Sequence, residues 1–415
     1  MPSSIVEPAS GRSDPRRRLL LDLFRVALES VDGRLVVRDA LKPPPDAQWH
    51  PKRPVWAAAV GKAASAMLLG AHEALGTSIE RSLLITKDDH VSSQAYGLPN
   101  IEIVESAHPM PDHRSLAAGE RLLRWVDELP ANVEPLFLIS GGASALVEAL
   151  VPGASFAQLT ALNAKGLASG WDIVELNTQR AQLSLIKGGR LAARLNGRPA
   201  RALFISDVPG HDPAVIGSGL MGPAPSSGSG SGDRIERAVV GSIDHAMDRV
   251  FAEAQKRGLS AWRDQRVFDG AADRLAVRFA HELHMSLHQL CVWGGESTVM
   301  LPEHPGRGGR NQHLALAAAR IIAGHENLLL LVAGTDGTDG VTSDAGALVD
   351  GETCSRVALS ELDVQSSLAR ADSGTALAAA GDLIHTGPTG TNVGDIVIGL
   401  KMPRDAAADY VSSGA

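Results

Sequence analysis

The sequence predicts an α/β fold in two domains, and three observations carry this prediction. Short apolar segments with strand character alternate along the chain with longer segments of helical period. Several strand-like segments end in glycine turns, such as Gly61-Lys62 and Ser140-Gly141-Gly142. A length of 415 residues is enough for two or three domains. Such alternation is typical of helices layered on a mostly parallel sheet, where ligands bind beyond the carboxyl ends of the strands.

The elements follow from local patterns. Strands are expected at 55–60, 82–86, 101–105, 135–139, 200–205, 290–293, 328–333 and 395–400. Helices are expected at 17–31, 63–75, 114–129, 145–150, 155–169, 173–195, 234–257, 271–287, 312–323 and 373–380. The serine-glycine run at 226–232 is the one low-complexity segment and indicates a linker or an exposed loop. We therefore expect one domain at 15–235 and a second at 236–410, meeting at a cleft.

Composition excludes several classes of function. A net charge of −8 and a pI near 6.0 argue against a nucleic-acid surface. The basic run Arg16-Arg17-Arg18 is expected to be solvated at the start of the first helix. Two cysteines, Cys291 and Cys354, give no disulfide framework and no metal spacing. No apolar run is long enough to span a membrane and the first residues lack a signal-peptide pattern, so we expect a cytoplasmic protein.

The stretch 292–350 combines glycines with charged residues. Gly294-Gly295 precedes Glu296, and the segment 306–311 contains Arg307, Arg310 and Asn311 among glycines. The apolar strand at 328–333 ends in a glycine-aspartate segment with Asp336 and Asp339. Glycines let backbone N–H groups approach an anion, arginines pair with phosphoryl or carboxylate oxygens, and aspartates bind divalent cations. The pattern indicates a site for an anionic substrate and a Mg-nucleotide, although Asp336 and Asp339 also fit simple Asp-Gly turns.

Other candidates each have a plain alternative. Lys62 follows a strand-terminal glycine and is either an anion ligand or a solvated lysine. The turn at 140–144 either cradles a phosphate or is an ordinary tight turn, and Asp207 either binds Mg²⁺ or caps a turn. Asn177 and Lys187 either reach a ligand or lie on the polar face of a helix. His108 and His113 are either bases or solvated loop residues.

Known nucleotide-binding fingerprints are absent from the sequence. It has no GxxxxGK[ST], no protein-kinase signature set, and no GxGxxG between a strand and a helix. The glycines of the 226–232 run lie among serines and follow no strand. A P-loop enzyme is therefore excluded, and an enzyme with a dinucleotide fingerprint is not supported.

Nine ordered motifs together resemble the class II glycerate kinases, whose C-terminal part is called MOFRL. They are AVGKA (59–63), HPMPD (108–112), ISGGASAL (139–146), IKGGRLA (186–192), SDVPGHDP (206–213), GGEST (294–298), GRGGRNQ (306–312), AGTDGTDG (333–340) and TGPTGTNVGD (386–395). The resemblance implies a Rossmann-like three-layer α/β/α N-terminal domain and an α/β MOFRL domain, with the active site in the cleft between them. It implies an enzyme that phosphorylates D-glycerate with ATP and Mg²⁺ or another divalent cation, usually giving 2-phosphoglycerate.

The resemblance also implies roles for individual residues. Lys62 and Arg310 are the candidates for catalysis, by neutralising the transferring phosphoryl group or by holding the glycerate carboxylate. The candidates for substrate or nucleotide binding are Ser140, Gly141, Gly142, Ser144, Asn177, Lys187, Glu296, Asn311 and Asp339. Asp207 and Asp336 are the candidate metal ligands. Beyond glycerate and ATP we expect neither nucleic acid nor membrane as a partner, and we allow for a homodimer.

The sequence departs from the family pattern at several positions. Ala143 stands where a third glycine is usual, and the residues after Asn177-Thr178 and after Gly340 differ. Leu220-Met221 replaces the usual proline-threonine. These departures bear on substrate detail and keep two alternatives open: a hydroxypyruvate reductase that uses NAD(P)H, and a ligand-binding family member without catalysis.

Overall fold

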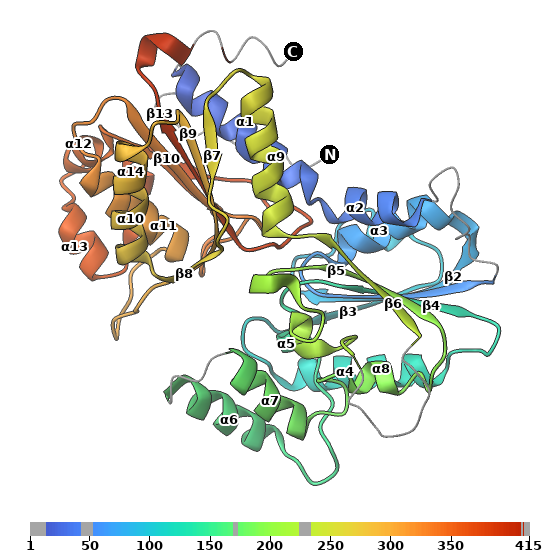
Figure 1. Ribbon diagram of the computed structural model, residues 1–415. Helices are drawn as coiled ribbons and strands as arrows, with labels where there is room; N and C mark the ends of the chain where they lie inside the picture. Colours follow the sequence, from blue (N-terminus) through green and yellow to red (C-terminus); the bar gives the residue numbers. More distant parts are fainter. Residues whose placement is uncertain (1–13, 43–52, 169–172, 224–233, 408–409, 411–415) are drawn as a thin grey trace. The chain divides into compact units, whose positions relative to one another are not determined.

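The computed structural model describes residues 14–42, 53–168, 173–223, 234–407 and 410, which form two compact units (Figure 1). The N-unit comprises the described residues within Val31–Ser242 together with Gly390–Asn392. The C-unit comprises those within Met1–Ser30, Ile243–Thr389 and Val393–Ala415. Contacts thus divide the chain at Ser242, and they place the first helix in the C-unit. The boundary at 235/236 stays a prediction, and the 226–232 run lies outside the described residues.

The N-unit is built on a parallel six-stranded sheet. Its strands are β1 (Val55–Val60), β2 (Ile79–Lys87), β3 (Ile101–Ser106), β4 (Glu134–Ile139), β5 (Ala200–Ile205) and β6 (Ile235–Gly241). Their order is β3-β2-β1-β4-β5-β6 and every neighbouring pair is parallel. This is the Rossmann strand order. The order in which successive strands are added reverses between β1 and β4, while all strands stay parallel. The Rossmann-like prediction is confirmed.

Helices cover both faces of this sheet and complete three layers (Figure 1). The helices of the N-unit are α2 (Gly33–Leu41), α3 (Ala64–Leu75), α4 (His113–Asp127), α5 (Ala143–Leu146), α6 (Phe156–Ala168), α7 (Ile173–Leu183) and α8 (Arg190–Ala193). Small residues let α2 and α3 approach closely, since a Cβ on Gly70 would lie 2.1 Å from the carbonyl oxygen of Arg34. The abundant alanine and glycine of the sequence therefore serve close packing.

The C-unit contains a mixed sheet, not the mostly parallel one that strand-helix alternation predicted. Its strands are β7 (Ala261–Arg263), β8 (Phe268–Ala271), β9 (Leu290–Thr298), β10 (Leu328–Gly334), β11 (Gly346–Asp350), β12 (Leu383–Ile384) and β13 (Asp395–Lys401). The order is β12-β11-β10-β13-β9-β7, with β8 also paired to β9. Strands β9 to β13 pair antiparallel, whereas β7 and β8 run parallel to β9. Periodicity cannot set strand direction, because a buried strand is apolar in either case.

Helices also flank the C-unit sheet on both sides (Figure 1). They are α1 (Pro15–Ser30), α9 (Ile243–Lys256), α10 (Ala272–Met285), α11 (Arg310–Ile321), α12 (Thr353–Ala358), α13 (Val364–Ala369) and α14 (Ser373–Ala380). One core holds the inner faces of α10, α11 and α14 against the sheet, with Phe279 and Trp293 at 4.9 Å between ring centroids. No helix among the described residues is long and apolar enough to cross a membrane.

Several predicted elements are wrong in extent. The expected helix at 234–257 is β6 followed by α9, and the expected helix at 173–195 ends at Leu183. Gly188 and Gly189 then take positive φ angles of 61° and 78° just before the short helix α8, so the chain is not helical between α7 and α8. The expected helix at 145–150 is the single turn α5, and β9 continues through Gly294-Gly295 to Thr298. Strands β7, β8, β11 and β12 and helices α2, α12 and α13 were not predicted.

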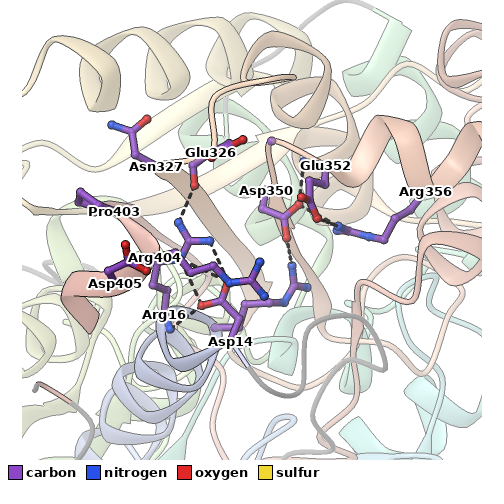
Figure 2. A pocket seen from close by; sticks show the side chains of 12 residues that line it. Asp14, Arg16, Glu326, Asn327, Asp350, Glu352, Arg356, Pro403, Arg404 and Asp405 are labelled. Carbon is purple, nitrogen blue, oxygen red and sulfur yellow. Dashed lines mark hydrogen bonds and ion pairs between the residues drawn. The ribbon is translucent and has the colours of Figure 1, made fainter. Parts of the chain in front are cut away.

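The start of α1 is buried against the C-unit sheet, and Figure 2 shows the pocket of about 640 Å³ beside it. The Arg17 side chain is 3% exposed; its Nη2 donates to Asp382 at 2.8 Å and to the Leu348 carbonyl at 2.6 Å, and its Nη1 to Asp350. Arg356 pairs with the same two carboxylates. The prediction that Arg16 and Arg17 are solvated is wrong, because the helix that carries them lies across the ends of β11 and β13. Paired arginines thus fix α1 to the C-unit.

Replacing Arg17 with methionine should lower the free energy of unfolding by about 3 kcal/mol. The variant leaves the buried Asp382 with one arginine fewer, and breaking a buried pair is costly. Urea unfolding measures the change. The matched control is Arg18→Met, at the exposed position next along α1, which should stay within about 0.5 kcal/mol of the wild type. Equal losses in both variants would contradict the argument.

Candidate functional site

The turns after β1 and β4 are joined by two hydrogen bonds where the strand order reverses. The Lys62 N–H donates to the Gly141 carbonyl at 2.9 Å, and the Ala63 N–H donates to Ser140 Oγ at 3.1 Å. A Cβ on Gly61 would lie 2.1 Å from Ser140 Oγ, so only glycine allows this approach. The structure therefore brings Lys62, Ser140 and Gly141 together, at the edge where doubly wound sheets bind ligands.

Gly142 supports two side chains at this edge. Its φ of 83° suits glycine, and a Cβ there would lie 3.1 Å from Lys62 Cγ and 3.2 Å from His108 Nε2. His108 belongs to the loop after β3, so three strand ends supply this group. Helix α5 begins directly after Gly142 but has only four residues. The half-buried Lys62 and His108 therefore lie side by side against the glycine turn.

Asp207 reaches the same turn from the end of β5. A Cβ on Gly141 would lie 2.1 Å from Asp207 Oδ2 and 2.3 Å from Asn392 Nδ2. Asn392 Nδ2 donates to Asp207 Oδ2 at 3.3 Å. Asn392 comes from the short C-terminal segment that belongs to the N-unit. A carboxylate and an amide thus pack against Gly141, while Lys62 and His108 pack against Gly142.

Lys187 and Asn177 are engaged within the N-unit. The Lys187 side chain is 2% exposed, and its Nζ donates to Glu148 Oε2 at 2.7 Å and to the Ser144 carbonyl at 2.8 Å. Burial lowers the pKa of Lys187, while the Glu148 carboxylate opposes this shift. Asn177 Oδ1 accepts a hydrogen bond from Ser218 Oγ at 2.9 Å. Lys187 therefore holds the chain just after the glycine turn, a supporting contact that the sequence did not suggest.

Arg310 in the C-unit is the first residue of α11 and is held by two carboxylates. Its Nε donates to Asp395 Oδ2 at 2.7 Å and its Nη2 to Asp395 Oδ1 at 3.0 Å, while Nη1 donates to Glu296. Burial by itself lowers the pKa of Arg310, but Asp395 and Glu296 outweigh burial and raise it above its ordinary value. The guanidinium is therefore a permanent, fixed positive charge. Arg307 is tied separately, to Asp344 at 2.6 Å.

Asp339 caps the N-terminus of α11. Its carboxylate accepts from the N–H groups of Asn311 at 3.0 Å and Gln312 at 2.8 Å, so two end donors of the helix are satisfied. A Cβ on Gly309 would lie 2.3 Å from the Asp339 carboxyl carbon, which explains the glycine before the arginine. Burial raises the pKa of Asp339 to about 7; the Asp395 carboxylate adds to this rise, and the two N–H donors oppose it.

The two predicted metal ligands lie in different units. Asp207 is in the N-unit, and Asp336 of the C-unit accepts from the Thr338 N–H at 2.9 Å in an Asp-Gly turn. Among the described residues no group of three His, Cys, Asp or Glu side chains is placed to hold a metal ion.

Sequence reasoning gave no role to Asp395, Asn392 or Glu148, and it left His108 open between base and solvated loop residue. Asp395 and Asn392 both lie in the motif at 386–395, which was noted only as a family signature. Among the predicted residues, the structure groups Lys62, Ser140, Gly141, Gly142 and Asp207 in the N-unit. It groups Glu296, Arg310, Asn311 and Asp339 in the C-unit.

Comparisons with known proteins agree with this architecture. Residues 19–251 match the family model described as a domain of unknown function, DUF4147, and residues 289–395 match the MOFRL family. The D-glycerate 2-kinase of Thermotoga maritima is 36% identical over 82% of this chain and 89% of its own. The chain belongs to the class II glycerate kinase family.

Other family members extend the comparison. The crystal structure of glycerate kinase from Thermotoga maritima aligns with a TM-score of 0.80 at 33% identity, covering 93% of this chain and 99% of that chain. A protein of Agrobacterium vitis described as a putative hydroxypyruvate reductase is 32% identical over 92% of this chain and 93% of its own. Proteins with either name therefore share this family.

Replacing Gly142 with alanine should lower kcat/KM by about tenfold, because the new Cβ pushes Lys62 and His108 away by a few tenths of an ångström. Gly153→Ala is the matched control. Gly153 has a similar φ of 87° but nothing within 4 Å of the added Cβ. An alanine in the left-handed conformation costs about 1–2 kcal/mol of stability in both variants. Only Gly142→Ala should therefore lose activity. Steady-state kinetics and melting temperatures test this, and equal activities would refute it.

The raised pKa of Asp339 should make stability depend on pH. The folded chain keeps this proton up to about pH 7, whereas the ordinary value is 3.8. The folded state therefore binds more protons between these values, and its free energy of unfolding falls as the pH rises through this window. Relative to Asp339→Asn, which does not titrate, the wild type should lose up to about 4 kcal/mol. Urea unfolding of both at several pH values measures the difference; a rise with pH would contradict the assignment.

Proposed function

We propose that this chain is an ATP-dependent kinase that phosphorylates D-glycerate, giving 2-phosphoglycerate. One observation carries the proposal. The chain shares its family and 82% of its length with a D-glycerate 2-kinase. In agreement with this, Lys62 and the glycine turns of the N-unit lie where the strand order of its sheet reverses. Phosphoryl transfer needs little covalent chemistry from a protein, so positioning and fixed charge suffice.

The N-unit group suits the phosphates or the carboxylate of a ligand. Gly141 and Gly142 have no side chains, so an anion can approach their backbone N–H groups, whereas the Gly61 N–H donates to the Ile85 carbonyl at 3.1 Å. Lys62 adds a positive charge on the same turn, and we propose that it neutralises the phosphoryl group in transfer or the glycerate carboxylate. Ser140 and Ser144 line this turn in the same proposal.

The C-unit group supplies the second cation. We propose that Arg310 stabilises negative charge during transfer, since a planar guanidinium pairs two oxygens at once. Glu296, Asn311 and Asp339 surround it, and Asp339 fixes the start of the helix that presents it. Asn177 and Lys187 are proposed as outer members of the N-unit site.

ATP is the phosphate donor that a glycerate kinase requires, and Mg²⁺ is our proposal. Mg²⁺ commonly takes one or two protein carboxylates and completes its coordination with phosphates and water. Asp207 fits this need, since its carboxylate and the Asn392 amide stand within van der Waals reach of the Gly141 α-carbon with no Cβ between. Asp207 would hold the ion, with Asp336 as the second candidate. When bound, the ion would neutralise charge on the nucleotide phosphates.

Hydroxypyruvate reduction is the second candidate function, favoured by the names of some relatives. Against it, the turn after β1 carries Gly61-Lys62 in place of a dinucleotide fingerprint. A family member that binds ligands without catalysis is the third candidate, motivated by Ala143 and the other departures. The cytoplasmic location, the homodimer, the cleft and the domain limits of 15–235 and 236–410 stay predictions.

Three assays separate these functions. Coupled ADP release with D-glycerate and Mg²⁺ should show turnover, and phosphorus NMR should identify 2-phosphoglycerate as the product. NADH oxidation with hydroxypyruvate should be absent. Calorimetric binding of ATP or glycerate without any product would instead establish the non-catalytic alternative.

Arg310→Lys should lower kcat by about 10²-fold or more, as expected for the loss of an electrostatic stabiliser. Lysine keeps the charge but cannot pair two oxygens in one plane. Determination of kcat, the glycerate KM and the melting temperature together tests this. A near-normal kcat, or inactivity explained by unfolding, would show that Arg310 is structural.

A further inference from the structure

Asp395 lies at a fixed point of the C-unit. It is the first residue of β13, the strand between β10 and β9, and it pairs with Gly334 on one side and Gly295 on the other. Its side chain is 1% exposed. A residue held by ladders on both sides has little freedom of backbone movement, so its carboxylate has a defined position.

The Asp395 carboxylate is contacted by Arg310, Asn311 and Ser297. Arg310 approaches its two oxygens with Nε and Nη2 at 2.7 and 3.0 Å, and Asn311 Nδ2 donates to Oδ1 at 3.0 Å. The Ser297 N–H lies at 3.5 Å from Oδ2. The first two residues of α11 are thus both attached to this one carboxylate.

This arrangement uses one edge of the guanidinium and leaves another. An arginine has five N–H donors in a planar fork. Asp395 occupies the Nε–Nη2 edge, which leaves the Nη1–Nη2 end as the edge for a ligand. Glu296 contacts Nη1, but its side chain is 56% exposed, unlike that of Asp395. The buried carboxylate is therefore the permanent partner, and it sets the direction in which the Nη1–Nη2 edge points, where a ligand anion would take the place of the exposed Glu296.

We propose that Asp395 is a positioning residue for phosphoryl transfer, which aims the Arg310 guanidinium at the anionic group of the reaction. The inference rests on the proposed role of Arg310. Displacement of a charge-stabilising group by about 1 Å costs on the order of 10²-fold in rate. A change at Asp395 that leaves the ion pair intact but moves it should therefore impair catalysis.

Asp395→Glu makes that change. Glutamate keeps the negative charge but is longer by one carbon–carbon bond, about 1.5 Å, so the guanidinium must move. We expect kcat to fall by about 10- to 100-fold with a smaller change in the glycerate KM. Asp395→Asn, which keeps the size and removes the charge, should lower kcat as well. If Asp395 served only to pair a charge, the glutamate variant would retain full kcat.

A double-mutant cycle with Arg310→Lys tests whether the two residues act as one. We expect Asp395→Glu to reduce kcat far less in the Arg310→Lys background than in the wild type. The control for loss of a buried aspartate–arginine pair is Asp264→Asn. Asp264 is 4% exposed and pairs with Arg278 in the same unit. This control should lower the melting temperature without changing kcat.

Three results would overturn the proposal: kcat within twofold of wild type in Asp395→Glu, fully multiplicative losses in the cycle, or an equal loss in Asp264→Asn. Absence of glycerate-dependent turnover in the wild type would refute the proposed function instead. Calorimetry with glycerate and with ATP then tests Asp395 by itself. A tenfold weaker affinity for either ligand in Asp395→Glu supports positioning; unchanged affinities, or no binding by the wild type, overturn it.

Discussion

The strand order of the N-unit sheet constrains everything at its carboxyl edge. Strands β2 and β3 continue from β1 on one side, while β4, β5 and β6 lie on the other. The turns after β1 and β4 are consequently neighbours that lead to different helices, and two hydrogen bonds between them fix Lys62 against Ser140 and Gly141. The candidate site residues of this unit depend on that junction for their positions.

Glycines, which have no side chain, determine how closely the elements approach in both groups of site residues. At Gly61, Gly141 and Gly309 a single Cβ would lie close to 2 Å from a neighbouring oxygen or carboxyl group. Such positions cannot tolerate alanine without local movement, whatever their backbone angles. The glycines thus let elements approach closely, and at Gly141 the missing side chain also exposes a backbone N–H to an anion. The first is visible in the structure, and the second is part of the proposed function.

Buried carboxylates in the C-unit hold arginines and the start of a helix in place. Asp339 satisfies two N–H groups at the start of α11, Asp395 holds the guanidinium of Arg310, and Asp382 holds Arg17. Each buried charge is matched by an arginine or by backbone donors, as burial requires. The aspartates near glycines in the sequence therefore do mark an organised group of residues. Asp339, Asp395 and Asp382 hold a helix end or an arginine in place.

The sequence by itself determined the apolar strands, the glycine turns at their ends and the family. Strand β1, the turn at Ser140-Gly141-Gly142 and the α/β class follow from patterns within a few residues, because strand propensity and glycine flexibility are local properties. The tertiary structure alone decided strand direction in the C-unit, the attachment of α1 there, and the partners of Lys187 and Arg310. Those depend on residues such as Glu148 and Asp395, which lie 39 and 85 positions away along the chain. Burial and pairing across such separations leave no periodic signal in the sequence, so only the folded chain specifies them.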